Sequence, residues 1–320
     1  MAGVTVGVDV GGTKIQSAAL RAKKVAGAYR AATPQTGAGD VATAIIESVQ
    51  KALAEAGAAP TDLRAVGIGA PGQIDREAGT VASSPNLPGF QGVEPVDLGS
   101  LVSKGLAGVP VTLDNDVRVA ILGEWRRGAG RPFKDVLGAW VGTGVGGGLV
   151  LDGVLREGHG AAGEIGHTIV KPGGRICSDG RRGHLEAYAG RGRMEARARS
   201  LVKRGHSTVL FEIMKKKGRT RVSSGVIAEA LEREDPMTLT LIEDAVWALG
   251  VALASAQNLL DLEAIIIGGG LGDRLGAPFV ARIAKEMEPN LFVPDRPPVM
   301  LTTEFGDLSG AVGAATLVGG

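Results

Sequence analysis

Cysteine, net charge and long apolar runs are all scarce in this sequence. A single Cys among 320 residues excludes an internal disulfide and fits a reducing cytoplasm. The 35 basic and 34 acidic residues leave a formal net charge of +1, which argues against a nucleic-acid or acidic-lipid partner recognised through bulk charge. No uninterrupted apolar stretch reaches the roughly 18–20 residues that span a bilayer, and the N-terminus lacks the pattern of a signal peptide. We therefore expect a cytoplasmic globular protein with no membrane partner.

Glycine, in contrast, is abundant, with 51 residues. Many glycines indicate many tight turns and places where the backbone approaches a ligand closely. They also make glycine-rich motifs common by chance. The length of 320 residues is enough for two domains of ordinary size.

Hydrophobic periodicity predicts alternating strands and helices along the chain. Val4, Val6, Val8 and Val10 alternate with polar or small residues, which is typical of a strand, and GGTK then turns the chain into a second strand. This second strand covers residues 15–20, and the further predicted strands cover residues 25–31, 64–70, 109–113, two runs within 135–155, and 264–270. The predicted helices cover residues 40–56, 116–127, part of 191–222, 235–260 and 309–317. This order of elements predicts an α/β protein with mixed sheets.

Three of the strands run into glycine turns, at residues 9–14, 142–148 and 268–272. Backbone N–H groups in such turns can surround phosphate oxygens without obstruction by side chains. Each turn alone is as well explained by an ordinary tight hairpin. Three together, the first of them beginning at Asp9, favour phosphate binding.

Two familiar nucleotide motifs do not fit. GVDVGGTK ends in Gly-Thr-Lys and leads to a strand, whereas a P-loop ends in Gly-Lys-Ser/Thr and leads to a helix. GTGVGG at 142–147 and GIGAPG at 67–72 both satisfy G-x-G-x-x-G, but neither opens a predicted helix. A Rossmann domain is therefore not expected.

Short polar groups suited to vicinal hydroxyls follow several of the predicted strands. Asn115 and Asp116 lie between a strand and a helix, where Asp116 is either the helix N-cap, a general base for a hydroxyl, or both. The other candidates for holding a sugar are Asn86, Glu164, His167 and Glu186. Each of them alone is as well explained by a solvated loop residue.

The motifs together resemble the ROK family (repressors, ORFs, kinases) within the actin-like ATPase superfamily. DVGGTK resembles the first phosphate hairpin of that superfamily, GTGVGGG the second and IIIGGGLG the adenosine-side turn; ND…LGE, GEIGH and CSDGRRGHLE then follow the ROK pattern in order. The resemblance implies a two-domain actin-like (ribonuclease H-like) fold with the active site in the interdomain cleft. We expect a small domain of residues 1–115 with 300–320, and a larger one of 116–299.

The resemblance also implies roles for particular residues. Asp116 would be the catalytic base, and Asp9 would organise Mg²⁺ through water. The implied sugar-binding residues are Asn86, Asn115, Asp116, Glu164, His167 and Glu186. The implied nucleotide-binding residues are Asp9, Gly11, Gly12, Thr13, Lys14, Thr143, Gly144, Gly269 and Gly270.

The segment from His167 to His184 carries the family's structural zinc pattern in altered form. His167 and Cys177 match the family, while Asp179 and His184 stand where the family has its second and third Cys. Both replacements are competent zinc ligands, so we expect a structural His₂-Cys-Asp zinc site. The alternative is a metal-free loop in which Asp179 pairs with Arg181 or Arg182. A second departure is Arg118, where relatives often have Asn; we expect a solvated helix residue there, and the alternative is that Arg118 alters the pocket or meets an anionic group.

The function that the resemblance favours is an ATP-dependent hexose kinase of carbohydrate metabolism that phosphorylates the sugar 6-hydroxyl, with glucokinase and hence glycolysis as the leading expectation. Fructose, mannose, allose or an N-acetylhexosamine as the sugar, and polyphosphate as the donor, stay open. A homodimer is expected because dimers are common in the family. Two other classes are a sugar-responsive transcriptional regulator, for whose DNA-binding domain the sequence before Val4 leaves no room, and an actin-like filament protein, which would need no sugar site.

Overall fold

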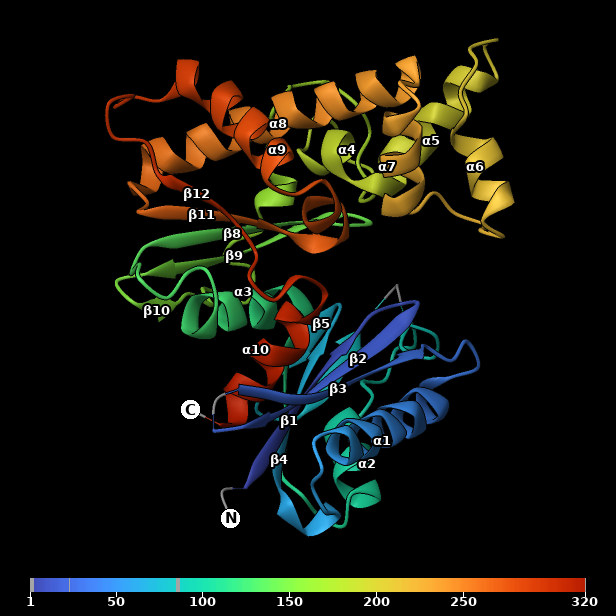
Figure 1. Cartoon of the computed structure of the whole chain (residues 1–320), viewed down its shortest axis with the longest axis vertical. Helices are drawn as coiled ribbons and strands as arrows, with labels where there is room; N and C mark the ends of the chain where they lie inside the picture. Colours follow the sequence, from blue (N-terminus) through green and yellow to red (C-terminus); the bar gives the residue numbers. More distant parts are fainter. Residues whose placement is uncertain (1–2, 23, 85–86, 320) are drawn as a thin grey trace. The chain divides into compact units, whose positions relative to one another are not determined.

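The computed structural model describes residues 3–22, 24–84 and 87–319 (Figure 1). The chain divides into two compact units: the first runs up to Arg131 and resumes at Asp307, and the second spans Pro132–Gly306. The expected boundaries, after residues 115 and 299, differ from these. Helix α3 (Asp116–Arg127) packs on α10 (Ser309–Val318) within the first unit, and strand β12 (Val299–Thr302) pairs with β11 (Ala264–Gly268) in the second.

The first unit is a five-stranded mixed sheet with helices on both faces. Its strand order is β3-β2-β1-β4-β7, in which β1, β2 and β3 are antiparallel neighbours and β1, β4 and β7 run parallel. The strands are β1 (Val4–Val10), β2 (Lys14–Arg21), β3 (Lys24–Ala32), β4 (Leu63–Ala70) and β7 (Val111–Asn115). The four valines of β1 are fully buried in a core shared with α1 (Ala38–Glu55) and α2 (Leu98–Gly105), while α10 covers the opposite face (Figure 1). A short 3₁₀ turn (Pro60–Asp62) and a β5–β6 ribbon (Gln73–Asp75, Thr80–Ser83) complete the unit.

Helix α10 approaches its neighbours so closely that only glycine fits at the contacts. A Cβ atom added to Gly7 of β1 would lie 1.9 Å from the carbonyl oxygen of Ala311, and one on Gly67 of β4 would lie 1.8 Å from that of Ala314. On the other side, a Cβ on Gly313 would lie 1.6 Å from the carbonyl oxygen of Val119 in α3. The polar face of β1, which carries Asp9, therefore meets the first turn of α10.

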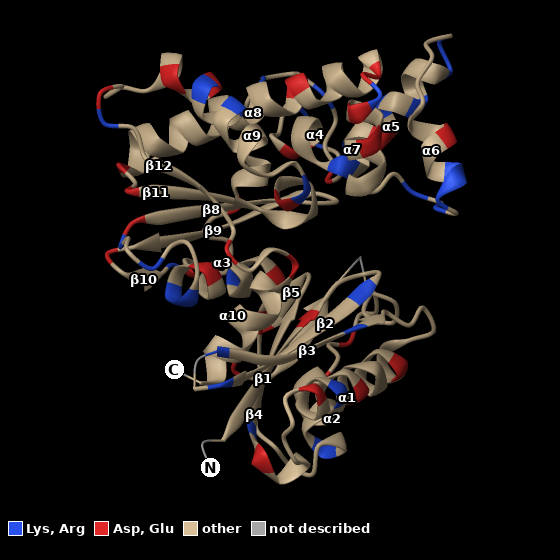
Figure 2. Ribbon diagram, in the orientation of Figure 1, with Lys and Arg blue, Asp and Glu red and all other residues tan. Residues whose placement is uncertain are grey.

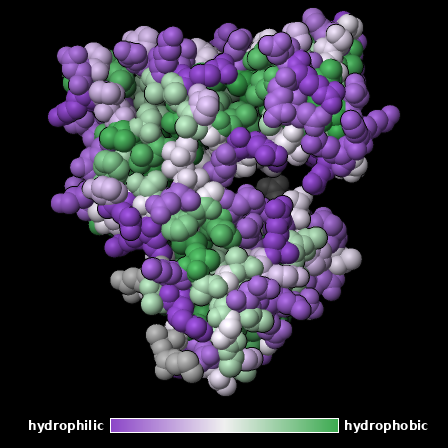
Figure 3. Space-filling view, in the orientation of Figure 1, coloured by the Kyte–Doolittle hydropathy of each residue, from purple (hydrophilic) through white to green (hydrophobic). Residues whose placement is uncertain are grey.

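The second unit contains another five-stranded sheet, in the order β10-β9-β8-β11-β12. Its remaining strands are β8 (Val136–Val141), β9 (Val145–Leu151) and β10 (Val154–Leu155), and β8 and β9 form the predicted hairpin. The helices are α4 (Glu186–Ala189), α5 (Arg191–Val202), α6 (Leu210–Lys216), α7 (Ser224–Glu232), α8 (Pro236–Leu260) and α9 (Gly269–Met287), with 3₁₀ turns at Ile165–His167 and Glu288–Asn290; a further 3₁₀ turn, Gly306–Leu308, leads into α10 of the first unit. Hydrophilic residues dominate the visible surface over α5 and α6 (Figure 3).

Helix α8 is the central core helix of the second unit. Asp235 is its N-cap and accepts the backbone N–H of Thr238 at 2.9 Å, and Pro236 is its first residue, both as predicted. This helix is long and apolar enough to cross a bilayer, but 67% of its most apolar window is buried inside the protein. It is therefore explained as the core of a globular unit.

Helix α9 is absent from the prediction. The apolar strand was expected to reach residue 270 and end in a glycine turn, but it ends at Gly268, and Gly269 begins the helix with φ of 80°. A non-helical residue, Gly276 (φ 60°, ψ −151°), and Pro278 kink the helix two turns later. The glycines and the proline mark the start and the kink of a helix here, where the sequence suggested a loop.

Candidate active site and metal cluster

Asp9 lies at the carboxyl end of β1, under the first turn of α10. A Cβ atom on Gly310 would lie 2.7 Å from Asp9 Cγ, so glycine is needed for this approach. Burial, and to a smaller extent the nearby carboxylates of Asp116 and Asp307, raise the pKa of Asp9 to about 7, while Lys14 acts in the opposite direction. Asp9 and Asp116 therefore interact electrostatically within the first unit, as two acidic groups of one site would.

The first glycine hairpin is held from behind by β3 and the segment after it. Thr33 donates its hydroxyl to the carbonyl of Gly11 at 2.6 Å and its N–H to the carbonyl of Thr13 at 3.2 Å. Gln35 donates to the carbonyl of Gly12 at 3.1 Å. These bonds turn the carbonyl oxygens of residues 11–13, which carry partial negative charge, toward the protein. Lys14 closes the hairpin by pairing with Asp307 at 2.9 Å.

The N-cap of α3 is Asn115, and Asp116 is the first helical residue. Asn115 Oδ1 accepts the N–H groups of Val117 at 3.0 Å and Arg118 at 3.2 Å. The interpretation of Asp116 as the N-cap is therefore wrong by one residue, because β7 runs on through Asn115. Asp116 accepts the N–H of Val117 at 2.9 Å, which orients its carboxylate at the start of the helix.

Arg118 is buried and paired, so the expectation of a solvated residue is wrong. Only 8% of it is exposed, and its Nε lies 3.3 Å from Oδ1 of Asp114, which is itself 3% exposed. Arg76, from the β5–β6 ribbon, lies 3.4 Å from the other oxygen of Asp114. Asp114 in turn accepts the N–H of Asn115 at 2.8 Å. No clear sequence signal indicated this network under the Asn-Asp pair, because Asp114 lies in β7 and Arg118 in α3, so the i, i+4 rule for helices does not apply to them.

The second glycine hairpin lies in the second unit and rests on Glu186. The N–H of Gly142 bonds to the carbonyl of Gly144 at 2.9 Å, which closes the turn around Thr143. Glu186, only 8% exposed, accepts the N–H of Val145 at 2.9 Å. A Cβ on Gly144 would lie 2.2 Å from the same carboxylate oxygen. The predicted sugar-binding residue Glu186 is thus also a support for the predicted phosphate hairpin.

Arg191 is a further residue at this hairpin that the sequence analysis missed. Its guanidinium donates to Thr143 Oγ1 at 2.9 Å and to Ser224 Oγ at 3.0 Å. A Cβ on Gly270, at the start of α9, would lie 3.8 Å from Arg191 Nη1. The structure therefore brings Thr143 and the Gly269–Gly270 segment to the same guanidinium. An arginine between two glycines, five residues after Glu186, was the only signal in the sequence.

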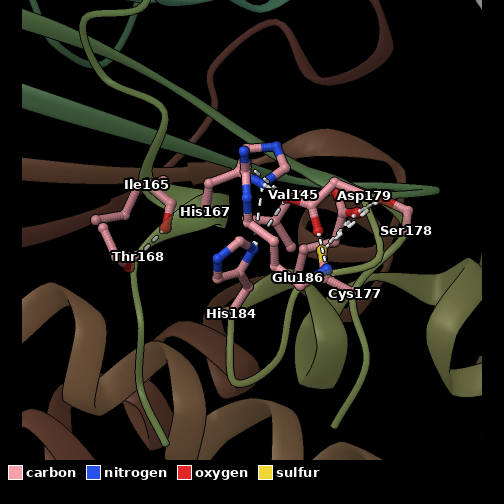
Figure 4. A network of polar contacts seen from close by, with 10 residues as sticks. Val145, Ile165, His167, Thr168, Cys177, Ser178, Asp179, His184 and Glu186 are labelled. Atoms are coloured by element: carbon pink, nitrogen blue, oxygen red, sulfur yellow. Dashed lines mark hydrogen bonds and ion pairs between the residues drawn. The ribbon is translucent and has the colours of Figure 1, made fainter. Parts of the chain in front are cut away.

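The four predicted metal ligands converge on one point of the second unit (Figure 4). One ligand atom from each of His167, Cys177, Asp179 and His184 lies within 4.8 Å of the others. Asp179 Oδ2 is 3.4 Å from the Nδ1 atom of each His, and the two Nδ1 atoms are 3.4 Å apart. Nitrogen, sulfur and oxygen ligands around a tetrahedral zinc ion lie at comparable separations, so the donor set fits zinc.

The alternative pairing of Asp179 is also present. Arg181 lies 3.3 Å from Asp179 Oδ2, and its N–H donates to Oδ1 at 3.0 Å, whereas Arg182 bonds to the carbonyl of Gly174. The N–H of Arg181 holds the pKa of Asp179 below its usual range, and burial raises the pKa of Cys177. Asp179 therefore satisfies both predictions in the same position: it lies among the other three metal ligands, and it also pairs with Arg181.

Glu186 links the cluster to the hairpin, as Figure 4 shows. Cys177 Sγ lies 3.4 Å from Glu186 Oε1, and Ser178 donates its hydroxyl to the same oxygen. The other carboxylate oxygen of Glu186, Oε2, accepts the backbone N–H of Val145. A change at Cys177 can therefore reach the second hairpin through a single side chain.

The remaining predicted sugar-binding residues are placed as follows. Glu164 is exposed and precedes the 3₁₀ turn Ile165–His167, which lies against β9 because Gly147 and Gly166 leave room for the close approach. His167 is 39% exposed, so it has an open side as well as a side facing the cluster. Asn86 lies outside the described residues.

Comparison with known proteins gives a consistent result. A model of the ROK family matches residues 5–320. The chain is 33% identical to a glucokinase of Streptomyces coelicolor, with 98% of this chain and 97% of the relative covered. It is 27% identical to an N-acetylmannosamine kinase of Haemophilus influenzae, with 96% and 93% covered. The structure of a ROK family glucokinase from Streptomyces griseus in complex with glucose and AMPPNP matches with a TM-score of 0.80 at 32% identity, covering 98% and 99% of the two chains.

The chain therefore belongs to the ROK family, and the predicted family is confirmed. The predicted α/β fold of the actin-like ATPase type, with mixed sheets, is confirmed as well.

Proposed function

We propose that this protein is an ATP-dependent hexose kinase that transfers a phosphoryl group to the sugar 6-hydroxyl, with glucose as the leading substrate. The observation that carries the proposal is the pair Asp9 and Asp116, which end or follow strands of one sheet and lie close enough for the charge of Asp116 to raise the pKa of Asp9. One carboxylate suits a metal-bound donor and the other a hydroxyl acceptor. The similarity to glucokinases along nearly the whole chain supports the same function.

The donor would be held by the glycine segments. Backbone N–H groups of Gly11, Gly12 and Thr13, with Lys14, would contact the phosphates, together with Thr143 and Gly144, and Gly269 and Gly270 would lie beside the nucleoside. Asp9 would hold Mg²⁺ through water, and the bound ion would neutralise charge on the phosphates. The bonds from Thr33 and Gln35 keep carbonyl oxygens from repelling those phosphates.

Asp116 would act as the base. Its carboxylate would take the proton of the 6-hydroxyl while the oxygen of that hydroxyl forms a bond to the γ-phosphorus, and the bond from that phosphorus to the β–γ bridging oxygen breaks. A carboxylate of ordinary basicity is adequate, because phosphoryl transfer is largely dissociative and the proton is accepted late. The bond from Val117 N–H would keep the carboxylate in place.

The sugar would be bound by the short polar groups. Asn115 uses its carbonyl oxygen to cap α3, so its NH₂ group would be the part offered to a hydroxyl. Asn86, Asp116, Glu164, His167 and Glu186 would supply the other contacts. Because the relatives include glucokinases and N-acetylmannosamine kinases, both glucose and N-acetylmannosamine must be tested as substrates.

We further propose that His167, Cys177, Asp179 and His184 hold a structural zinc ion. All four donor types bind zinc, and their convergence supports the assignment. The ion would fix the segment that carries His167 and Glu186 and would take no part in phosphoryl transfer. We also expect a cytoplasmic homodimer, in keeping with the family resemblance; light scattering tests the dimer.

A coupled assay of ADP release over a panel of hexoses tests the kinase. Glucose is expected to stimulate ADP release, and Asp116→Asn is expected to reduce the stimulated rate at least about 100-fold. Asp295→Asn, an exposed change of the same kind in the second unit, should leave the rate unchanged. If no sugar raises ADP release above the basal rate, the kinase proposal fails; if Asp116→Asn is fully active, the base is another residue.

A further inference from the structure

The guanidinium of Arg191 sits between two glycine segments that the sequence analysis assigned separately to a nucleotide. It is hydrogen-bonded to Thr143 in the β8–β9 hairpin and to Ser224 at the start of α7. A Cβ on Gly270 would lie 3.4 Å from Ser224 Oγ and 3.8 Å from Arg191 Nη1, so the first turn of α9 borders the same group. The backbone also ties this arginine to the hairpin, because the N–H of Arg191 bonds to the carbonyl of Gly142 at 3.1 Å.

Arg221 brings a second positive charge close to Arg191. A Cβ on Gly192 would lie 3.9 Å from Arg221 Nη2, and burial together with Arg221 lowers the pKa of Arg191, while Glu195 acts in the opposite direction. Among the described residues, no carboxylate forms an ion pair with Arg191, whereas Glu195, which is 5% exposed, is bound by Arg199 and Arg221. Helix α5 carries four arginines and one glutamate, and Figure 2 shows charged residues along α5, α6 and α7. A half-buried guanidinium held by two neutral hydroxyls has an unmet preference for an anion.

We propose that Arg191 is a donor-binding residue that contacts a phosphoanhydride chain at the second glycine hairpin, held in position by Thr143 and Ser224. This inference rests on the proposed kinase function and adds a side chain to it. A guanidinium has five N–H donors, and two atoms of Arg191 already point to hydroxyl groups. The remaining donors suit phosphate oxygens, which a guanidinium binds in a fork geometry that lysine cannot reproduce.

The same chemistry could come from the phosphates of a nucleotide or from inorganic polyphosphate. The alternative role is purely structural: Arg191 would connect α7 to the hairpin through its hydrogen bonds to Ser224 and Thr143. Binding measurements separate these roles, because loss of a purely structural arginine would alter the unfolding temperature while leaving the ionic part of donor binding intact.

The test is calorimetric titration of the full chain with Mg-ADP and, separately, with tripolyphosphate. Arg191→Gln is expected to weaken the binding of one of these two ligands, the one that represents the true phosphoryl donor, about 10- to 100-fold. It should also reduce the dependence of that affinity on salt, because a charged hydrogen-bonding group is lost. Arg219→Gln removes the same charge from an exposed position near α6 and should stay within about twofold of wild type. In kinetics, the KM for the donor should rise while the KM for the sugar is unchanged.

Each outcome decides a defined point. Affinity of Arg191→Gln within twofold of wild type for both ligands overturns the inference and leaves the kinase proposal standing. Weaker binding of Mg-ADP by Arg191→Gln identifies the nucleotide as the source of the phosphates. Weaker binding of tripolyphosphate alone identifies inorganic polyphosphate as the source. Arg191→Lys keeps the charge without the fork, so it carries the test if Arg191→Gln does not fold: about tenfold weaker binding supports the inference, and unchanged binding overturns it. If wild-type protein binds neither ligand and shows no sugar-stimulated ADP release, the proposed function itself fails.

Discussion

Glu186 accepts the backbone N–H of Val145 at 2.9 Å, and this bond is buried between α4 and the start of β9. Glu186→Ala would leave that N–H group without its partner, so we expect a loss of about 1–3 kcal/mol in the free energy of unfolding of the second unit. Glu186→Gln retains a carbonyl oxygen that can accept the same N–H and should lose much less. Urea denaturation of the two variants checks the difference. Equal stability of both would mean that the bond contributes nothing.

Asp9 makes stability depend on pH. Its pKa is raised from 3.8 to about 7 in the folded protein, so between these values the folded state binds more protons than the unfolded state. Stability of the magnesium-free protein should therefore fall as pH rises from about 4 to about 7, and the cost should be absent below pH 4.

Asp9→Asn removes this cost. We expect the variant to be up to about 4 kcal/mol more stable than wild type at pH 8, equally stable near pH 4, and inactive as a kinase. Thermal unfolding of magnesium-free protein across this range is the measurement, with Asp295→Asn as the control. A constant difference at all pH values would point to packing at Asp9 instead of its ionisation.

The metal cluster predicts about one zinc ion per chain in protein purified without a His-tag. His184→Ala removes a buried ligand and should abolish most of the bound zinc, while His206→Ala, an exposed histidine outside the cluster, should retain it. Elemental analysis gives the ratio, and a chelator should lower the unfolding temperature of wild type because metal binding adds to folding free energy. Zinc at a small fraction of one per chain would mean that Asp179 is held by Arg181 and the histidines alone.

The close packing of α10 predicts a large effect from a single methyl group. Gly67→Ala would place a carbon 1.8 Å from a backbone carbonyl of α10, so the helix would have to move and the first unit should be destabilised by several kcal/mol. Gly39→Ala is the matched control: it lies in the first turn of α1, with nothing within 4 Å of the new carbon, and should be neutral or slightly stabilising. Circular dichroism during thermal unfolding compares the two. Similar melting temperatures would contradict the packing at α10.

Local sequence patterns predicted most of the fold, because the spacing of apolar residues reflects which face of a strand or helix is buried. The alternation in β1 and the Asp235–Pro236 start of α8 are examples in which the residue pattern and the structure agree. Helix α9 was missed because Gly276 and Pro278 look like breakers, and only packing against α8 and β12 shows that the chain stays helical on both sides of the kink.

The sequence predicted those site residues that belong to recognisable motifs and missed those that depend on contacts between distant segments. The convergence of the four metal ligands follows from their motif, whereas Arg118 was misjudged because its partners, Asp114 and Arg76, come from a strand and a distant ribbon. Strand β7 was expected to end before Asp114, since a charged residue rarely continues a buried strand, and the pairing explains why this one does. Arg191 depends in the same way on Ser224, 33 residues away, which no local pattern connects to it.

The position of α10 also bears on the order in which the chain folds during synthesis. All strands and helices of the second unit are complete once residue 306 has been made, but the first unit still lacks the helix that covers one face of its sheet. That face of the sheet stays uncovered until α10 (Ser309–Val318) has left the ribosome. The N-terminal strands, although made first, are therefore expected to reach their final packing last, with the apolar residues beside Gly7 and Gly67 exposed to chaperones in the meantime.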